Sequence, residues 1–410
     1  MKFEKLIGQK AIKKRLMHMV EQNRLSHALL FLGKEGSGAL PLALAFAQYI
    51  VCTSSKSRRS LSPALFEEMI LSPPPGDEAG RDTDSCGVCP ACLKATKLIH
   101  PDIHFSFPVI TKKPGEIPIS ADYITKWREF VSASPYGNVY DWLQFIAAEN
   151  KQGNITTKEC EDINHKISLK SFESQYKILV MWMPEFLGKE GNKLLKLIEE
   201  PPPDTIFIFV AEDEDAILPT ILSRTQLVKI PILSNDEIED ALIKNEDVNE
   251  AKAKQIAGIC EGNYREALQM LQHAEEDWQG KVREWLNAIV KTGPIAQIRW
   301  IDEISKLGRE KQKQFLRYFI HLLRQAVKLR VHENAYIATD LLTNHIAEKE
   351  VDFAVRLNKL CSLEAQEAII TELDKATYYI ERNAHAKMLF HALTIRLYHI
   401  IKDNSVILVN

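Results

Sequence analysis

Apolar residues in the first 230 positions form short runs separated by helical patterns. The run Ala28–Leu32 is followed by a glycine-rich loop, and a helical pattern then extends from about Ala39 to Cys52. Later apolar runs lie at Ile103–Val109, Tyr176–Met183, Ile206–Val210 and Leu227–Ile230. Short apolar strands that alternate with helices are typical of a parallel sheet covered by helices on both faces. We therefore predict an α/β core for residues 1–232.

The pattern becomes helical throughout after Pro231. Within residues 311–331, for example, Phe315, Phe319 and Leu322 recur every three or four positions, which is the spacing of one buried helix face. A compact three-helix unit ends shortly after Gly262–Leu268, so we place a boundary near residue 279. The predicted division is a core (1–232), a small helical unit (233–278) and an all-α domain (279–410).

Two segments of the core interrupt this pattern. Residues 53–85 are rich in serine and proline, with a basic first part and an acidic last part, and we expect an exposed insertion there. The segment Tyr136–Gly153 is unusually aromatic and fits either a loop or a surface for a partner.

Composition and charge narrow the class of protein. The chain has 410 residues, 45% hydrophobic and 26% charged, with a formal net charge of -3. Its longest apolar stretch, Ala39–Cys52, is shorter than the ~20 residues of a bilayer span, and Met1–Lys5 does not begin a signal peptide. We expect a cytoplasmic protein with no membrane contact. The net charge excludes nucleic-acid binding through an overall basic field.

The loop after the first strand has the glycine spacing of a phosphate loop, with Gly33, Gly36 and Gly38 at the start of a helix. Lysine and serine or threonine should follow, to contact the phosphates and magnesium. Ala39 and Leu40 stand there instead. A glycine loop unrelated to phosphate is the alternative interpretation.

A second part of the same chemistry is missing. The strand near residue 180 should end in an acidic pair for the metal and the attacking water, but it ends in Trp182-Met183. Two absent sets of groups argue against intrinsic ATP hydrolysis.

Three cysteines lie within seven residues, at Cys86, Cys89 and Cys92. Such turns let thiolates converge on one tetrahedral zinc ion, which needs a fourth ligand. A closed site of this kind has no open position for catalysis, so we predict a structural zinc. A reduced thiol cluster or redox motif is the alternative. The remaining cysteines sit singly in helical patterns and are predicted to be buried apolar residues: Cys160, Cys260 and Cys361.

Several motifs together resemble bacterial clamp-loader AAA+ subunits over about residues 1–270. They are Phe3–Gln9 with Arg24–Ala28, the stretch Asn192–Pro202, and Leu218–Arg224. Within this family the degenerate loop resembles the delta-prime branch of DNA polymerase III more than the ATP-hydrolysing gamma/tau branch.

The resemblance implies a function and partners. It implies a non-hydrolysing clamp-loader subunit that assembles with gamma/tau and delta subunits in a hetero-pentamer and helps to load the sliding clamp on primed DNA. Residues 233–278 would then be the family's lid and residues 279–410 its oligomerising collar. Two alternatives are an active AAA+ ATPase of the gamma/tau type and a zinc-dependent nucleic-acid-binding module.

The resemblance also implies roles for single residues. Arg224 corresponds to an arginine finger that acts in trans on nucleotide bound by a neighbouring subunit; the alternative is a surface ion pair. Cys52 corresponds to the fourth zinc ligand, with His100 as the reserve candidate. Arg265 stands where the lid senses nucleotide in the family, and a salt bridge from lid to core is an equally good interpretation.

Overall fold

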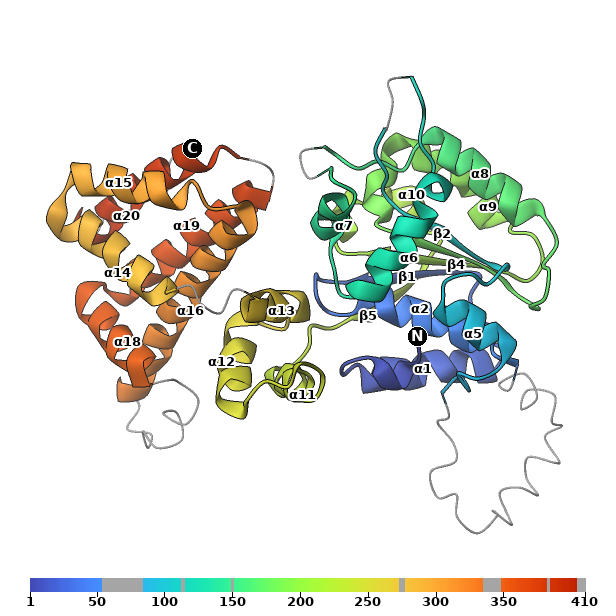
Figure 1. Cartoon of the computed structure of the whole chain (residues 1–410), viewed down its shortest axis with the longest axis horizontal. Coiled ribbons are helices and arrows are strands. Elements are labelled where there is room, and N and C mark those ends of the chain that lie inside the picture. The colour runs from blue at the N-terminus through green and yellow to red at the C-terminus, as the bar shows by residue number, and fades with distance from the viewer. Residues whose placement is uncertain are drawn as a thin grey trace, which may run out of the picture. The chain divides into compact units, whose positions relative to one another are not determined.

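The computed structural model describes the chain over residues 1–53, 84–111, 115–148, 151–272, 277–334, 348–381 and 384–403. Most of the predicted insertion at 53–85 lies outside these residues. The chain forms two compact units, Met1–Ala241 with Glu261–Glu266, and Leu242–Cys260 with Ala267–Asn410 (Figure 1). The three-part division into core, lid and collar stays a prediction. No helix of the described ranges combines the length and apolar character that a bilayer crossing needs.

The first unit is built on a five-stranded sheet. Its strands are β1 (Ala28–Gly33), β2 (Ile103–Ser106), β3 (Lys177–Trp182), β4 (Thr205–Ala211) and β5 (Gln226–Ile230). They lie in the order β2-β3-β4-β1-β5, and every neighbouring pair is parallel. This sheet confirms the predicted α/β fold class. Each strand falls within or overlaps an apolar run of the sequence. The three central strands β3, β4 and β1 are almost entirely buried, because a strand covered on both faces has no polar side.

Helices cover the two faces of the sheet (Figure 1). Alternating residues of β1 illustrate this, because Leu29 and Phe31 join one hydrophobic core and Leu30 joins the other. The first core includes residues of α1 (Lys10–Glu21), α2 (Ala39–Val51), α5 (Pro90–Thr96), α6 (Ile124–Ala133) and α7 (Val139–Phe145). The second includes residues of α8 (Thr157–Ser168), the 3-10 segment Pro184–Leu194, α9 (Leu195–Glu199) and α10 (Pro219–Leu222).

Helix α2 is the central helix of the first core. All of its residues are buried, and Pro41 sits in its first turn, where a missing N–H costs no hydrogen bond. The helix starts directly after Gly38, so packing of α2 fixes the position of the glycine loop.

Beyond Ile230 the described residues form helices. They are α11 (Asn235–Glu246), α12 (Glu250–Cys260), α13 (Tyr264–Gln272), α14 (Trp278–Asn287), α15 (Pro294–Ile304), α16 (Arg309–Asn334), α18 (Glu348–Leu360), α19 (Leu363–Glu381) and α20 (Ala386–Asp403), with a π-helical turn at Ala288–Thr292. Helix α16 contains the predicted apolar stripe, and Phe315, Phe319 and Leu322 are fully buried. Trp285 stacks on Trp300 in this core, with ring centroids 4.6 Å apart.

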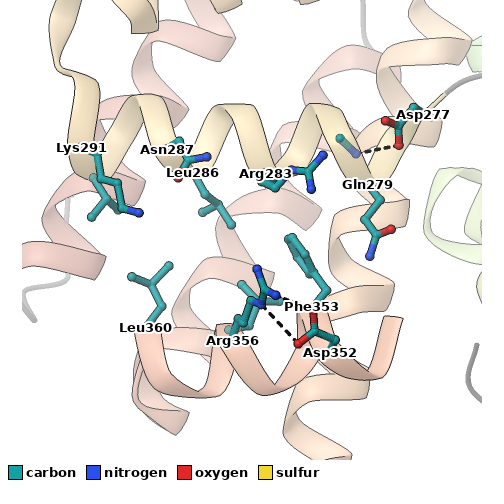
Figure 2. Close-up of a pocket in the computed structure, with 13 residues that line it drawn as sticks. Asp277, Gln279, Arg283, Leu286, Asn287, Lys291, Asp352, Phe353, Arg356 and Leu360 are labelled. Atoms are coloured by element: carbon teal, nitrogen blue, oxygen red, sulfur yellow. Dashed lines mark hydrogen bonds and ion pairs between the residues drawn. The ribbon is translucent and has the colours of Figure 1, made fainter. Parts of the chain in front are cut away.

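A pocket of about 820 Å³ opens between α14 and α18 in the second unit (Figure 2). Leu286, Phe353 and Leu357 supply apolar surface, while Arg283 and Lys291 lie along the α14 side. The C-terminal helices thus leave a groove of mixed polarity on their surface.

Candidate functional site

The glycine loop lies between β1 and α2, at the carboxyl end of the sheet, where ligands bind in open α/β sheets. Gly36 and Gly38 have φ angles of +72° and +88°, which favour glycine. A Cβ on Gly36 would lie 2.0 Å from Asn263 Oδ1. The loop therefore has a backbone conformation that favours glycine, and the Asn263 side chain packs directly against Gly36.

Positions 39 and 40 serve packing. Ala39 and Leu40 are both buried in the first hydrophobic core. At the end of β3, Trp182 is also buried, and its ring centroid lies 5.0 Å from that of Trp127. The described loop and strand end therefore offer no lysine, hydroxyl or carboxylate at the three positions that ATP hydrolysis would use.

Tyr136 occupies the space beside the loop. Its ring carbon Cε1 lies 3.0 Å from the position of a Cβ on Gly38, and its hydroxyl accepts a hydrogen bond from Ile7 N (3.1 Å). Burial raises the pKa of Tyr136 to about 12. The remaining cavity, between the loop, Pro135–Gly137 and Trp182, has a volume of only about 20 Å³. That is space for about one water molecule.

Arg265 binds two carboxylates beside the loop. Its Nε and Nη2 donate to Asp141 Oδ2 and Oδ1 at 2.5 and 2.6 Å, and Nη1 donates to Glu35 Oε1 at 2.9 Å. Asn138 and Asn263 donate their side-chain amides to the two Glu35 oxygens at 2.9 and 3.1 Å. The Arg265 side chain is 5% exposed. Of the two interpretations of Arg265, the ion pair is the one present in the structure.

Sequence reasoning missed Tyr136, Glu35 and Asp141. The aromatic segment near Tyr136 is part of the core, because α7 begins there and Trp142 is fully buried. One signal was available: Asn138 and Asp141 form a reciprocal capping box at the start of α7, which marks a helix start. No sequence signal connects Asp141 with Arg265, which is far away along the chain.

The structure brings together the four cysteines named from the sequence. The Sγ atoms of Cys52, Cys86, Cys89 and Cys92 all lie within 4.8 Å of one another. The Sγ atoms of Cys86 and Cys92 are 3.9 Å apart, close to the ~3.8 Å expected for two thiolates on a tetrahedral zinc with bonds of ~2.3 Å. Four convergent sulfur donors fit a closed zinc site.

Local structure explains this convergence. Cys52 follows the last turn of α2, and Cys89 is the N-cap of α5, where its sulfur accepts a bond from Cys92 N (3.4 Å). Gly87 has a φ of +74°, which allows the turn from Cys86 to Cys89.

His100, the reserve ligand, lies outside the cysteine group. Its Nε2 is 3.1 Å from Glu173 Oε1, and its Nδ1 accepts a hydrogen bond from Asp102 N (3.1 Å). The geometry therefore favours Cys52 as the fourth sulfur, although 33 residues separate it from Cys86 in the sequence.

Arg224 lies between α10 and β5, and its side chain is 32% exposed. Its Nε donates to Glu199 Oε1 (2.6 Å), and Nη1 donates to Thr220 O (2.8 Å). The surface ion pair, which was the alternative interpretation of Arg224, is thus present between Arg224 and Glu199. Both side chains are partly exposed to solvent.

The parallel sheet, the glycine loop after its first strand and the ion-paired Arg265 beside that loop define an AAA+-type α/β core. A family profile described as "DNA polymerase III, delta subunit" matches residues 8–64 and 75–234, more than half of the chain. The chain belongs to this family.

Individual relatives carry related names. The tau subunit of DNA polymerase III from Bacillus subtilis is 25% identical over 316 residues, which cover 76% of this chain and 44% of that protein. The delta' subunit of the same organism is 25% identical over 268 residues, covering 65% of this chain and 60% of that protein. The match thus covers less than two thirds of either relative. A solved gamma subunit-related protein from Thermotoga maritima is 16% identical, with a TM-score of 0.35 and coverage of 95% and 99% of the two chains.

Proposed function

We propose that this chain is a non-hydrolysing, delta-prime-type subunit of a bacterial clamp loader. It assembles with gamma/tau and delta subunits and helps them to place a sliding clamp on primed DNA in the cytoplasm. Membership of the DNA polymerase III delta subunit family, together with relatives named tau and delta', supports this role.

The closed nucleotide site is the observation that carries the non-hydrolysing part of the proposal. Pockets for small ligands have volumes of roughly 300–1,000 Å³, whereas the space beside this loop is about 20 Å³. Tyr136 fills it from one side. Arg265, the residue that would face a nucleotide phosphate, is bound by Glu35 and Asp141. Binding of ATP would need these groups to leave together.

Arg224 is the residue that acts on a neighbour. A guanidinium offers five N–H donors in a planar fork, and an arginine finger of this kind raises the rate of phosphoryl transfer by about 10³ to 10⁵. The partly exposed position of Arg224 after α10 supports a contact with the γ phosphate of ATP bound by an adjacent subunit. The ATP is hydrolysed by that subunit.

The four cysteines hold a structural zinc ion in this proposal. Zinc bound there would tie the end of α2 to the start of α5 and takes no part in phosphoryl transfer. Its four sulfur ligands leave no position for water or substrate.

An ATPase of the gamma/tau type is the second candidate, because relatives named tau and gamma match the chain. The absence of the loop lysine at Ala39 opposes it. No observation in the described residues favours the zinc-dependent nucleic-acid-binding alternative.

The test is a reconstituted clamp loader that contains Arg224→Ala. We expect the complex to assemble normally, while DNA-stimulated ATPase and clamp loading fall at least 100-fold. This lower bound is smaller than the ~10³ to 10⁵ rate increase that an arginine finger provides. Arg15→Ala, which removes an exposed arginine of α1, is the matched control and keeps the wild-type rate. Brisk ATP hydrolysis by the isolated chain, or a wild-type rate with Arg224→Ala, contradicts the proposal.

A further inference from the structure

Glu199 contacts the guanidinium of Arg224 from a separate element. Glu199 is the last residue of α9, and Arg224 follows α10. Glu199 Oε1 accepts from Arg224 Nε at 2.6 Å and also contacts Nη2. One carboxylate oxygen thus holds the inner edge of the guanidinium, and the pair crosses 25 positions of sequence.

Two further acceptors hold the Nη1 end. Arg224 Nη1 donates to the backbone carbonyl of Thr220 at 2.8 Å and to Ser223 Oγ at 3.2 Å. Ser223 Oγ itself donates to Thr220 O (3.2 Å). These contacts, together with those of Glu199, engage Nε, Nη1 and one side of Nη2. A long side chain with many rotamers is thereby held in one place.

The pair remains accessible to another protein. The side chains of Arg224 and Glu199 are 32% and 45% exposed. A surface ion pair of this kind contributes little to the free energy of unfolding. Fold stability therefore does not account for the contacts that Glu199, Thr220 and Ser223 make with Arg224. These contacts fix the plane and the direction of the Arg224 guanidinium.

We propose that Glu199 is a positioning residue for Arg224, which aims the guanidinium at an anionic phosphate on a neighbouring subunit. This inference rests on the proposed function of Arg224. A preorganised donor needs no rearrangement when charge develops in the transition state. Glu199 therefore acts on the rate of the chemical step and not on the binding of ATP by the neighbour.

The experiment compares variants in the reconstituted, DNA-stimulated complex. We expect Glu199→Ala to lower kcat about 10-fold to 100-fold with an unchanged KM for ATP, as for an interaction made only in the transition state. Glu199→Gln keeps an oxygen that accepts from Nε, so we expect it to restore most of the rate. Glu200→Ala changes the adjacent exposed carboxylate and is the matched control with wild-type kinetics.

A double variant separates positioning from a structural role. If Glu199 acts only through Arg224, then Glu199→Ala combined with Arg224→Ala has the same rate as Arg224→Ala alone. A further loss in the double variant, or an unchanged or faster rate with Glu199→Ala, overturns the inference. If Arg224→Ala itself leaves the rate unchanged, the proposed function fails as well, so the two failures are distinguishable.

Discussion

Asp102 shows how a single buried charge organises its surroundings. The residue is 2% exposed and accepts backbone N–H bonds from Phe172, Glu173 and Ser174 at 2.5, 2.9 and 2.7 Å. Burial by itself raises the pKa of Asp102, but the three donors outweigh it and hold the pKa below its ordinary value. The carboxylate fixes a loop whose tip, Phe172, is 82% exposed.

This lowered pKa predicts a pH-dependent contribution to stability. We expect Asp102→Asn to lower the free energy of unfolding by about 1–3 kcal/mol at pH 7, because one amide oxygen replaces a charged acceptor. The ionised form stabilises the fold above the unfolded pKa of ~3.9, and this contribution is lost as the pH falls through the lower folded pKa. Urea denaturation at pH 7 and pH 3 measures both values.

The control is Asp215→Asn, at an exposed carboxylate of the same unit, which should leave the urea midpoint unchanged. A difference between wild type and Asp102→Asn that stays constant from pH 7 to pH 3 would contradict the assigned role of the charge.

At the scale of one residue, the sequence indicated chemistry but not partners. The absence of lysine at position 39 could be recognised from the sequence, because the phosphate loop has a fixed spacing and Ala39 stands at the lysine position. The pairing of Arg265 with Asp141 could not be predicted from the sequence, because it depends on how α7 packs beside the loop. The contact of Glu199 with Arg224 could not be predicted for the same reason, since Arg224 follows another element.

The zinc-type turn is the clearest case at the scale of elements. The spacing of Cys86, Cys89 and Cys92 predicts a shared ion from local geometry alone. Cys52 could be added only by family resemblance, because no spacing rule reaches across the long insertion. Strands β1, β3 and β4 were predictable because each is almost continuously apolar. The edge strands β2 and β5 include polar positions, and β2 ends at Ser106, earlier than its apolar run.

We expect the purified protein to contain one zinc ion per chain. Cys89→Ser should weaken zinc binding more than about 10-fold, since removal of a residue that only hydrogen-bonds to a metal ligand already has an effect of that size. Metal analysis after dialysis against a chelator gives the retained zinc, and thermal melting should show a lower midpoint for the first unit. Removal of a thiolate leaves three sulfur ligands, which cannot close a tetrahedral site.

Cys160→Ser is the control, because Cys160 is a buried cysteine of the same unit that lies outside the cysteine group. Its sulfur donates to the Glu190 carbonyl (3.8 Å), a bond that serine can also make. Equal zinc content in wild type and Cys89→Ser would show that the group binds no zinc.

The whole chain contains separate hydrophobic cores in its two units. Trp127 stacks on Phe107 in the first unit, with centroids 4.2 Å apart, and Trp285 stacks on Trp300 in the second. Both Trp127 and Trp285 are almost completely buried. Chains with more than one core need not unfold in a single transition.

We therefore predict two resolvable unfolding transitions in urea. Trp285→Ala should lower the stability of one by about 3–5 kcal/mol through the cavity that it leaves, and Trp127→Ala should lower the other by a similar amount. Each variant is the control for its counterpart, and circular dichroism with metal release assigns the transitions. If both substitutions shift one common transition, the two cores unfold as a single unit.

The Glu35 carboxylate beside Arg265 has a consequence for timing. An anion that is part of the polypeptide has no dissociation constant, and its occupancy cannot follow the ratio of ATP to ADP in the cell. The Arg265 guanidinium therefore has the same counter-charge at any nucleotide concentration. In the proposed clamp loader, this part of the chain would keep one charge state while neighbouring subunits bind and release nucleotide.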